Sequence, residues 1–186
     1  MFKKLALALA AAASVMACDL PTDILSNNIT QGFSIQIQNA AVPKIHNHYL
    51  NLWDWGGGDE HLFVSPAGRR TTELQLINGV ITLPWDPPRR AVINGEHSDK
   101  DNTTKLFMTA RGDPRAIFDV VYGCNPDTDA VQVELAFKSR GEEEQGGAIG
   151  VREFSGDLDF RWTPAGNTAF DPDRPWTRVR FVVIYP

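Results

Sequence analysis

The sequence lacks the features that mark most membrane proteins and nucleic-acid-binding proteins. After residue 17 there is no apolar run long enough to cross a bilayer. Acidic residues outnumber basic ones by 23 to 18, and the formal net charge is −5 at pH 7. An acidic chain without clustered lysine and arginine argues against nucleic acid or an anionic membrane as a partner. We therefore expect no nucleic-acid partner and no membrane span.

Motifs of enzymes are also scarce. The chain has no G-x-S-x-G segment, and no spacing places a serine beside a base and an orienting acid. The glycine run Gly56-Gly57-Gly58 is not followed by the Lys-Ser/Thr pair of a phosphate-binding loop, so it is read as a tight turn. The sequence leans away from an enzyme, leaves the question open, and predicts no cofactor.

The first 17 residues have the pattern of a secretory signal peptide. Lys3 and Lys4 precede an apolar stretch from Leu5 to Val15, and small residues precede the bond after Ala17. This stretch is too short to span a membrane. We therefore predict that residues 1–17 are removed and that the protein is secreted into the extracellular space.

Only two cysteines are present, Cys18 and Cys124, and cleavage after Ala17 would place the first at the new N-terminus. In an exported chain two cysteines predict one disulfide. The alternative is a lipoprotein in which Cys18 is acylated. The acceptor sequences that begin at Asn28 and Asn102 favour secretion with N-glycosylation at both residues.

Alternation of apolar and polar residues is the main local signal in the rest of the chain. Every second residue is apolar in 33–37, 131–137 and 158–162, which is typical of half-buried strands. The dipeptide Asn78-Gly79 between two such segments predicts a tight hairpin. No window has the periodicity of a helix. Further strand candidates are His61–Ser65, Arg90–Ile93, Lys105–Ala110, Ala116–Tyr122, Ala148–Phe154 and Val179–Tyr185.

About ten short strands separated by turn residues predict an all-β fold. Two packed antiparallel sheets, a jelly-roll-like sandwich, are the preferred architecture, and a β-barrel or a β-trefoil is the alternative. We expect residues 18–32 to form an N-terminal extension tied to the domain, and residues 33–186 to form a single all-β domain.

Three longer phrases carry a resemblance to a known group of proteins. They are HNHYLNLWDWGGGDEHLFVSPAG, AVINGEHSDKDNTTKLFMTARGDPRAIFDVVYGCNPDTDAVQVELAF and FDPDRPWTRVRFVVI. From about Phe33 to Ile184 the chain resembles an uncharacterised family of small secreted fungal proteins. The resemblance implies an extracellular fungal protein with an all-β domain. It supplies no catalytic or ligand-binding residues that could be carried over to this chain.

Three of the four histidines lie between residues 46 and 61. His46 and His48 are two positions apart, so in a strand they point to the same face, and His61 could join them across a hairpin. Three imidazoles with a nearby carboxylate could bind zinc or copper. The spacing follows no established metal motif, and ordinary surface or half-buried histidines are the favoured reading.

The same segment holds residues suited to sugar recognition. Aromatic faces stack on sugar C–H groups, and carboxylates or amides bind hydroxyl groups. If Tyr49, Trp53 and Trp55 point away from the core, they could form such a platform with the carboxylates that follow. The alternative is that these aromatic side chains belong to the core. The candidate ligand-binding residues are Tyr49, Trp53, Trp55, Asp59 and Glu60.

The preferred hypothesis is a secreted, non-catalytic binding or surface protein that recognises a glycan, a cell wall or a host surface. The alternative is a secreted hydrolase or metalloenzyme that uses His46, His48 and His61. A purely structural role in a coat or wall is a third possibility. The oligomeric state is left open.

Overall fold

The computed structural model describes residues 18–54, 58–65 and 70–186, so the predicted signal peptide lies outside the described residues. Within these ranges the chain forms strands and no helix, and no helix long and apolar enough to cross a bilayer is found there. The strands are β1 (Ile29–Gln38), β2 (His48–Asp54), β3 (Glu60–Val64), β4 (Leu74–Ile77), β5 (Val80–Leu83), β6 (Arg89–Ser98), β7 (Thr103–Thr109), β8 (Ala116–Cys124), β9 (Val131–Arg140), β10 (Glu144–Gln145), β11 (Ala148–Phe154), β12 (Asp157–Thr163), β13 (Thr177–Arg178) and β14 (Arg180–Ile184).

Local sequence explains most of these strands. In β1 the alternating residues Phe33, Ile35 and Ile37 are all fully buried. Between β4 and β5, Asn78 and Gly79 adopt positive φ angles of 50° and 78°, as a two-residue hairpin turn requires. A side chain at Gly79 would also collide with the carbonyl oxygen of Phe118. The all-β prediction and the Asn-Gly hairpin are therefore confirmed.

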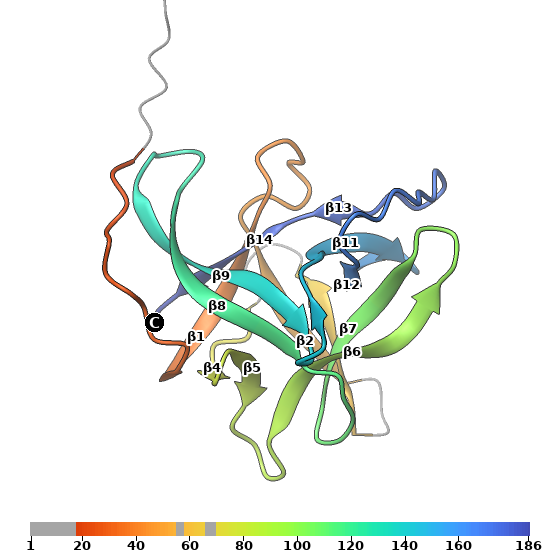
Figure 1. Cartoon of the computed structure of the whole chain (residues 1–186), viewed down its shortest axis with the longest axis horizontal. Helices are drawn as coiled ribbons and strands as arrows, with labels where there is room; N and C mark the ends of the chain where they lie inside the picture. The colour runs from red at the N-terminus through yellow and green to blue at the C-terminus, as the bar shows by residue number, and fades with distance from the viewer. Residues whose placement is uncertain (1–17, 55–57, 66–69) are drawn as a thin grey trace, which may run out of the picture.

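The strands close into an antiparallel barrel of ten strands (Figure 1). The closed circuit runs β1–β2–β3–β12–β7–β6–β5–β8–β9–β14 and returns to β1. The two-sheet sandwich is not confirmed, and its stated alternative, the barrel, is what forms. The physical reason is that the first and last strands pair with each other, from Ser34 with Ile184 to Gln38 with Arg180. This pairing removes the open sheet edges that a sandwich would leave.

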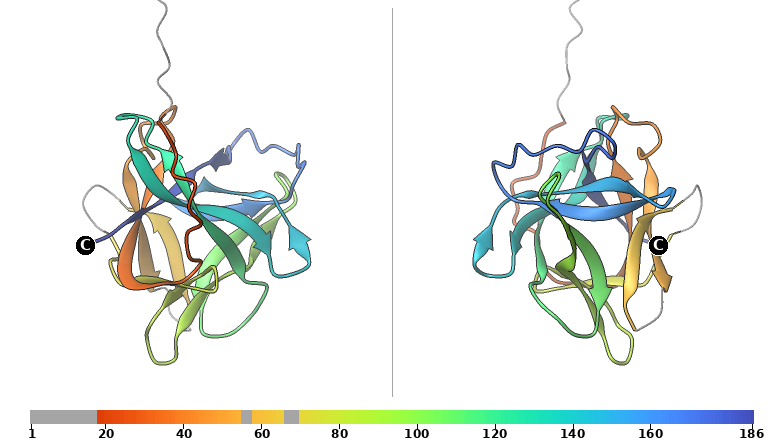
Figure 2. Two further views of the ribbon diagram at one scale, coloured as in Figure 1. Left: turned by 60° about the vertical axis from the view of Figure 1, so that its left-hand side comes forward. Right: turned by 90° about the vertical axis from the view of Figure 1, so that its right-hand side faces the viewer.

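Strand β4 pairs with both β1 and β5 and so divides the circuit into two parts. One part is a six-strand ring, β1–β4–β5–β8–β9–β14. The other part consists of the hairpins β2–β3, β6–β7 and β11–β12, whose second strands pair with one another. Each hairpin therefore touches the other two, as the right-hand view of Figure 2 shows for β11–β12 in blue and β6–β7 in green. The three hairpins thus close one end of the ring.

The core fills the interior of this arrangement. Rings from three different regions meet there: Phe181 stacks on Phe118 at 5.8 Å and meets Phe160 edge-on at 5.4 Å between centroids. Strand β14 lies between β1 and β9, and its three consecutive residues 181–183, which point alternately to opposite faces, are at most 5% exposed. The apolar run at the C-terminus is therefore a central strand covered on both faces, as its composition predicts.

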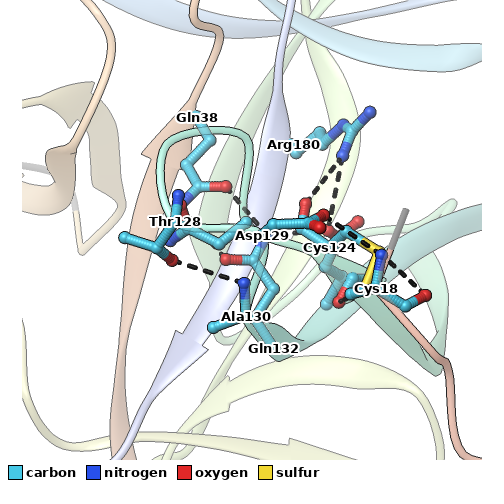
Figure 3. Close-up of a disulfide and its surroundings, with 11 residues drawn as sticks. Cys18, Gln38, Cys124, Thr128, Asp129, Ala130, Gln132 and Arg180 are labelled. Atoms are coloured by element: carbon cyan, nitrogen blue, oxygen red, sulfur yellow. Dashed lines mark hydrogen bonds and ion pairs between the residues drawn. A yellow bond between two sulfur atoms is a disulfide. The ribbon is translucent and has the colours of Figure 1, made fainter. Parts of the chain in front are cut away.

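A disulfide joins Cys18 to Cys124 across a sequence separation of 106 residues and confirms the predicted pairing (Figure 3). The sulfur of Cys18 is therefore not available for the acylation of a lipoprotein. The segment that follows is held along β8: the Tyr122 hydroxyl donates to Asp23 at 2.9 Å, and the Asn27 side chain donates to Asp119 at 2.8 Å. The first strand begins at Ile29, inside the predicted extension.

We predict that Cys18→Ser or Cys124→Ser lowers the free energy of unfolding by about 4–5 kcal/mol, because the cross-link limits the freedom of the unfolded chain. Urea unfolding of the oxidised protein and of each variant measures the difference. The double variant Cys18→Ser/Cys124→Ser should lose the same amount, since it lacks the same single bond. Unchanged unfolding midpoints in all three variants would contradict this prediction.

Candidate functional site

The position of Trp53 in the β2–β3 hairpin determines the direction in which its side chain points. Leu50 of β2 is fully buried in the core. Because successive side chains of a strand point to opposite faces, Asn51 and Trp53 lie on the face turned away from the core. Opposite them on β3, Asn51 pairs with Phe63 and Trp53 pairs with His61. The Trp53 side chain is 55% exposed, and its ring meets Phe63 edge-on at 6.1 Å. Trp53 therefore faces solvent.

Beside Trp53 lies a hollow of about 320 Å³, which we call the Trp53 hollow. The lining includes the aromatic rings of Trp53 and Phe63, the amide of Asn51 and the carboxylates of Asp54 and Asp157. Both carboxylates belong to exposed residues, and Asp157 comes from the start of β12, far along the chain. The hollow thus combines an exposed indole face with polar groups from two hairpins.

The other candidate ligand residues lie in different surroundings. Tyr49 is half-buried, and the Arg70 guanidinium lies over its ring at 5.3 Å. Asp59 is half-buried, whereas Glu60 is 5% exposed and lies 3.7 Å from the Arg89 guanidinium. Burial raises the pKa of the Glu60 carboxyl, although the Arg89 charge opposes the rise. Neither Asp59 nor Glu60 lines the Trp53 hollow.

Trp55 lies outside the described residues.

The first two predicted metal-binding histidines are each engaged with another part of the chain. His46 Nε2 lies 2.9 Å from a carboxylate oxygen of Asp127, and its Nδ1 accepts the backbone N–H of Asn39. His48 Nδ1 donates to the carbonyl oxygen of Ser65 at 3.0 Å. These contacts hold the two imidazoles against different segments, although they are only two positions apart.

The third histidine, His61, lies between the rings of Phe63 and Phe107, at 6.3 and 6.5 Å between centroids. The structure therefore does not bring the three histidines together. Across the described ranges, the one group of potential metal ligands found within 4.8 Å is Cys18, Cys124 and Asp129. Its two sulfur atoms are already joined in the disulfide.

The two predicted glycosylation residues are both exposed. Asn28 precedes β1, and its side-chain oxygen accepts the backbone N–H of Asn78 at 2.8 Å. Asn102 lies in the turn between β6 and β7 with a φ of 50°. Both amides are therefore on the surface, where a glycan would have to be attached.

A known protein family matches nearly all of the described chain. Residues 19–186 match a family described as a domain of unknown function (DUF7909). The chain belongs to this family. No curated protein and no solved structure matches it. Since the description of DUF7909 names no activity, functional conclusions for this chain must come from its own side chains.

A second feature of this DUF7909 chain, which the sequence pattern did not predict, lies behind Phe63. Six charged residues gather on the outward faces of the capping hairpins, and we call them the charge cluster. Lys105 Nζ lies between the rings of Phe63 and Phe154, at 5.2 and 4.7 Å from their centroids, and 3.6 Å from Asp159. The members are Glu96, Asp101, Lys105, Arg152, Asp159 and Arg161.

Most of the charge cluster is removed from water. Arg152, Asp159 and Arg161 are fully buried, and Asp101 and Lys105 are at most 5% exposed. Arg161 contacts Asp159 at 3.3 Å, and Arg152 contacts Asp101 at 3.1 Å. The sixth member, Glu96, is half-exposed and lies within 4 Å of both arginines. Three cations thus face three carboxylates, so the cluster is close to neutral.

Burial acts against several of these charges. Desolvation lowers the pKa of the Lys105 ammonium, although the carboxylate of Asp159 opposes this. Desolvation also raises the pKa of Asp159 despite the neighbouring cations. For Asp101 the opposite holds: burial is outweighed by hydrogen bonds from Ser98 and Thr103 and by Arg152, so its pKa is lowered. Neutral balance and mutual pairing allow the cluster to remain in the interior.

The sequence of β12 contains a pattern that indicates only part of this charge cluster. Asp159 and Arg161 alternate with Phe160 and Trp162, a pattern read as one buried face and one solvated face. The second face is buried as well, because β3, β7 and β11 surround β12 and bring Phe63 and Lys105 over it.

We predict that Asp159→Asn lowers the free energy of unfolding by about 3–5 kcal/mol, because it leaves buried cations uncompensated. The matched control is Asp113→Asn, which removes an exposed carboxylate 3.1 Å from Arg115. This control should cost less than about 1 kcal/mol. Urea unfolding at pH 7 compares the two, and equal losses would contradict a special role for the buried charge.

We also predict a pH dependence from His61. Burial lowers its pKa below the usual value of 6.5, and the nearby Lys105 charge lowers it further. The unfolded chain therefore takes up this proton at a higher pH than the folded chain. The resulting stability is complete at neutral pH and is lost as the pH falls below about 6.5. Urea unfolding between pH 7.5 and 5 should show a smaller loss in His61→Gln, and an identical loss would refute the assignment.

Proposed function

We propose that this chain is an exported, non-catalytic protein that binds a saccharide in the Trp53 hollow. The observation that carries the proposal is the 55% exposure of the Trp53 side chain at the edge of a hollow with polar walls. Large aromatic side chains are normally buried, so an exposed indole beside a concave surface suits a ligand.

The chemistry of the hollow supports a sugar over other ligands. The indole face of Trp53 can stack on the C–H groups of a pyranose ring. The amide of Asn51 and the carboxylates of Asp54 and Asp157 offer hydrogen-bonding groups for hydroxyls around that ring. Two carboxylates also disfavour anionic ligands such as phosphates. We therefore assign a neutral saccharide as the ligand class.

Export is supported by two features of the N-terminal region. The disulfide between Cys18 and Cys124 suits an oxidising compartment, where such bonds form and persist. It is also compatible with the predicted cleavage after Ala17, which would leave Cys18 as the first residue. The extracellular, fungal and glycosylated character of the protein forms part of this proposal, as does its association with a cell wall or a host surface.

For the fold, we propose a β-trefoil as the finer description of the barrel. The six-strand ring and the three capping hairpins support it, because a trefoil has this division of strands. In such a plan each hairpin is free to carry a different outer face. The Trp53 hollow belongs to the outer face of the β2–β3 hairpin.

We predict that Trp53→Ala weakens glycan binding by about 2 kcal/mol, which is roughly thirtyfold in affinity. A glycan array identifies the ligand, and calorimetric titration then gives the affinity of each variant. The matched control is Trp85→Ala, which removes another exposed tryptophan, 38% exposed, outside the hollow. Asp157→Asn should weaken binding with an unchanged thermal melt.

Two results would overturn the proposal. One is a wild-type protein that binds no glycan on the array. The other is a bound glycan whose affinity is the same in Trp53→Ala as in Trp85→Ala.

A further inference from the structure

A second hollow lies away from Trp53, where two strands of the ring separate. Strand β9 pairs with β14 only at Leu135 with Phe181 and at Glu134 with Val182. Just before β14, the backbone N–H of Val179 instead donates to Ile149 of β11 at 3.2 Å. A wedge therefore opens between β9 on one side and β11 with β13 on the other. We call it the apolar cleft.

The apolar cleft has a volume of about 820 Å³, within the range of pockets that hold small organic ligands. Its floor is the edge of the hydrophobic core: Leu135, Ile149, Val179 and Phe181 line it and are each at most 8% exposed. Phe137, which is half-buried, adds an accessible ring to the wall. A ligand entering the cleft would therefore meet apolar side chains interspersed with polar groups.

The rim of the cleft is positively charged, unlike the chain as a whole. Arg178 and Arg180 both line it, together with one carboxylate, Glu134. Glu134 lies 3.7 Å from Arg180 and also accepts a hydrogen bond from Gln132 at 2.8 Å. Among the residues that the structure describes, no carboxylate lies within 4.0 Å of the Arg178 guanidinium. The rim thus offers an exposed cation without a counter-ion beside an apolar floor.

The backbone of Arg178 is held in place. Its carbonyl oxygen accepts a hydrogen bond from the Asn39 side chain at 2.8 Å, and it pairs with Gly150 of β11. Gly150 has no side chain, and a Cβ there would collide with the Trp176 ring and with the carbonyl oxygen of Thr177. The base of the Arg178 side chain is therefore fixed at the rim, while its guanidinium can reach a ligand.

We propose that the apolar cleft is a second binding site, which takes a small amphiphilic acid. The apolar body of the ligand lies over Phe137 and Val179, and its single anionic group pairs with Arg178. This site is independent of the proposed saccharide site, because no residue lines both hollows. Apolar contacts contribute to the binding free energy, and the arginine selects acids over neutral molecules of the same shape.

The test uses the full oxidised protein and the fluorescent probe 1-anilinonaphthalene-8-sulfonate, which is itself an apolar body with one anionic group. We expect the probe to bind at one site and decanoate to displace it. Decanol, which has the same chain without the charge, should displace it at least about fivefold less well, as expected for the loss of one charge pair. Equal displacement by decanoate and decanol would overturn the role of the rim cation.

Variants locate the site. Arg178→Gln should remove the preference for decanoate over decanol, whereas Arg178→Lys should retain it. Ala136→Trp, at an exposed position that lines the cleft, should block probe binding with a cooperative thermal melt. The matched control is Lys138→Gln. This change removes an exposed cation of β9 that pairs with Asp119 outside the cleft.

Trp53→Ala should bind the probe as the wild type does, so the outcome is separate from that of the saccharide proposal. Three results would overturn the assignment: no probe binding to the wild type, full binding in Ala136→Trp, or an unchanged decanoate preference in Arg178→Gln. If Ala136→Trp does not fold, the Arg178 pair of variants decides alone.

Discussion

Pairing between the first and last strands is the constraint on which the rest of the structure depends. Five residue pairs join β1 to β14, so segments from opposite ends of the chain must meet before the ring can close. Once closed, the ring encloses the buried faces of both strands, including Ile35 and Phe181. The pairing also fixes where β14 begins, because the residues before it form hydrogen bonds with β11 instead. The apolar cleft is a direct result of this change of partner.

Closure has a different consequence at the capped end. Three hairpins converge there, so their outward faces crowd one another and polar side chains lose their access to water. In the charge cluster these side chains are paired, with cations and carboxylates in equal number. Lys105 also gains the aromatic faces of Phe63 and Phe154. Phe63 in turn supports Trp53, so the buried charges and the exposed indole share one layer of side chains.

Much of the local structure could be predicted from the sequence, because period-two alternation and turn residues act over a few positions. The Asn78-Gly79 hairpin and the strand from Phe33 to Ile37 are examples. The choice between a sandwich and a barrel could not be predicted from the sequence, because it depends on pairing between distant residues such as Ile35 and Val183. The sequence left open whether Trp53 points into the core or away from it, and only the surrounding strands select the outward direction. Asp157 joins the hollow through tertiary contact alone, for which no local pattern exists.

The three capping hairpins differ in what they present to solvent. Among the described residues, the large exposed apolar side chains include Trp53 on β2, and none lies on β6, β7, β11 or β12. In the part of the chain that the structure describes, the three hairpins thus offer one exposed aromatic platform, at Trp53. In the proposed saccharide site, a single platform would give single-point attachment, with an affinity set by one sugar contact. Firm adhesion to a repetitive polymer would therefore require several copies held side by side, where avidity multiplies the strength of each contact.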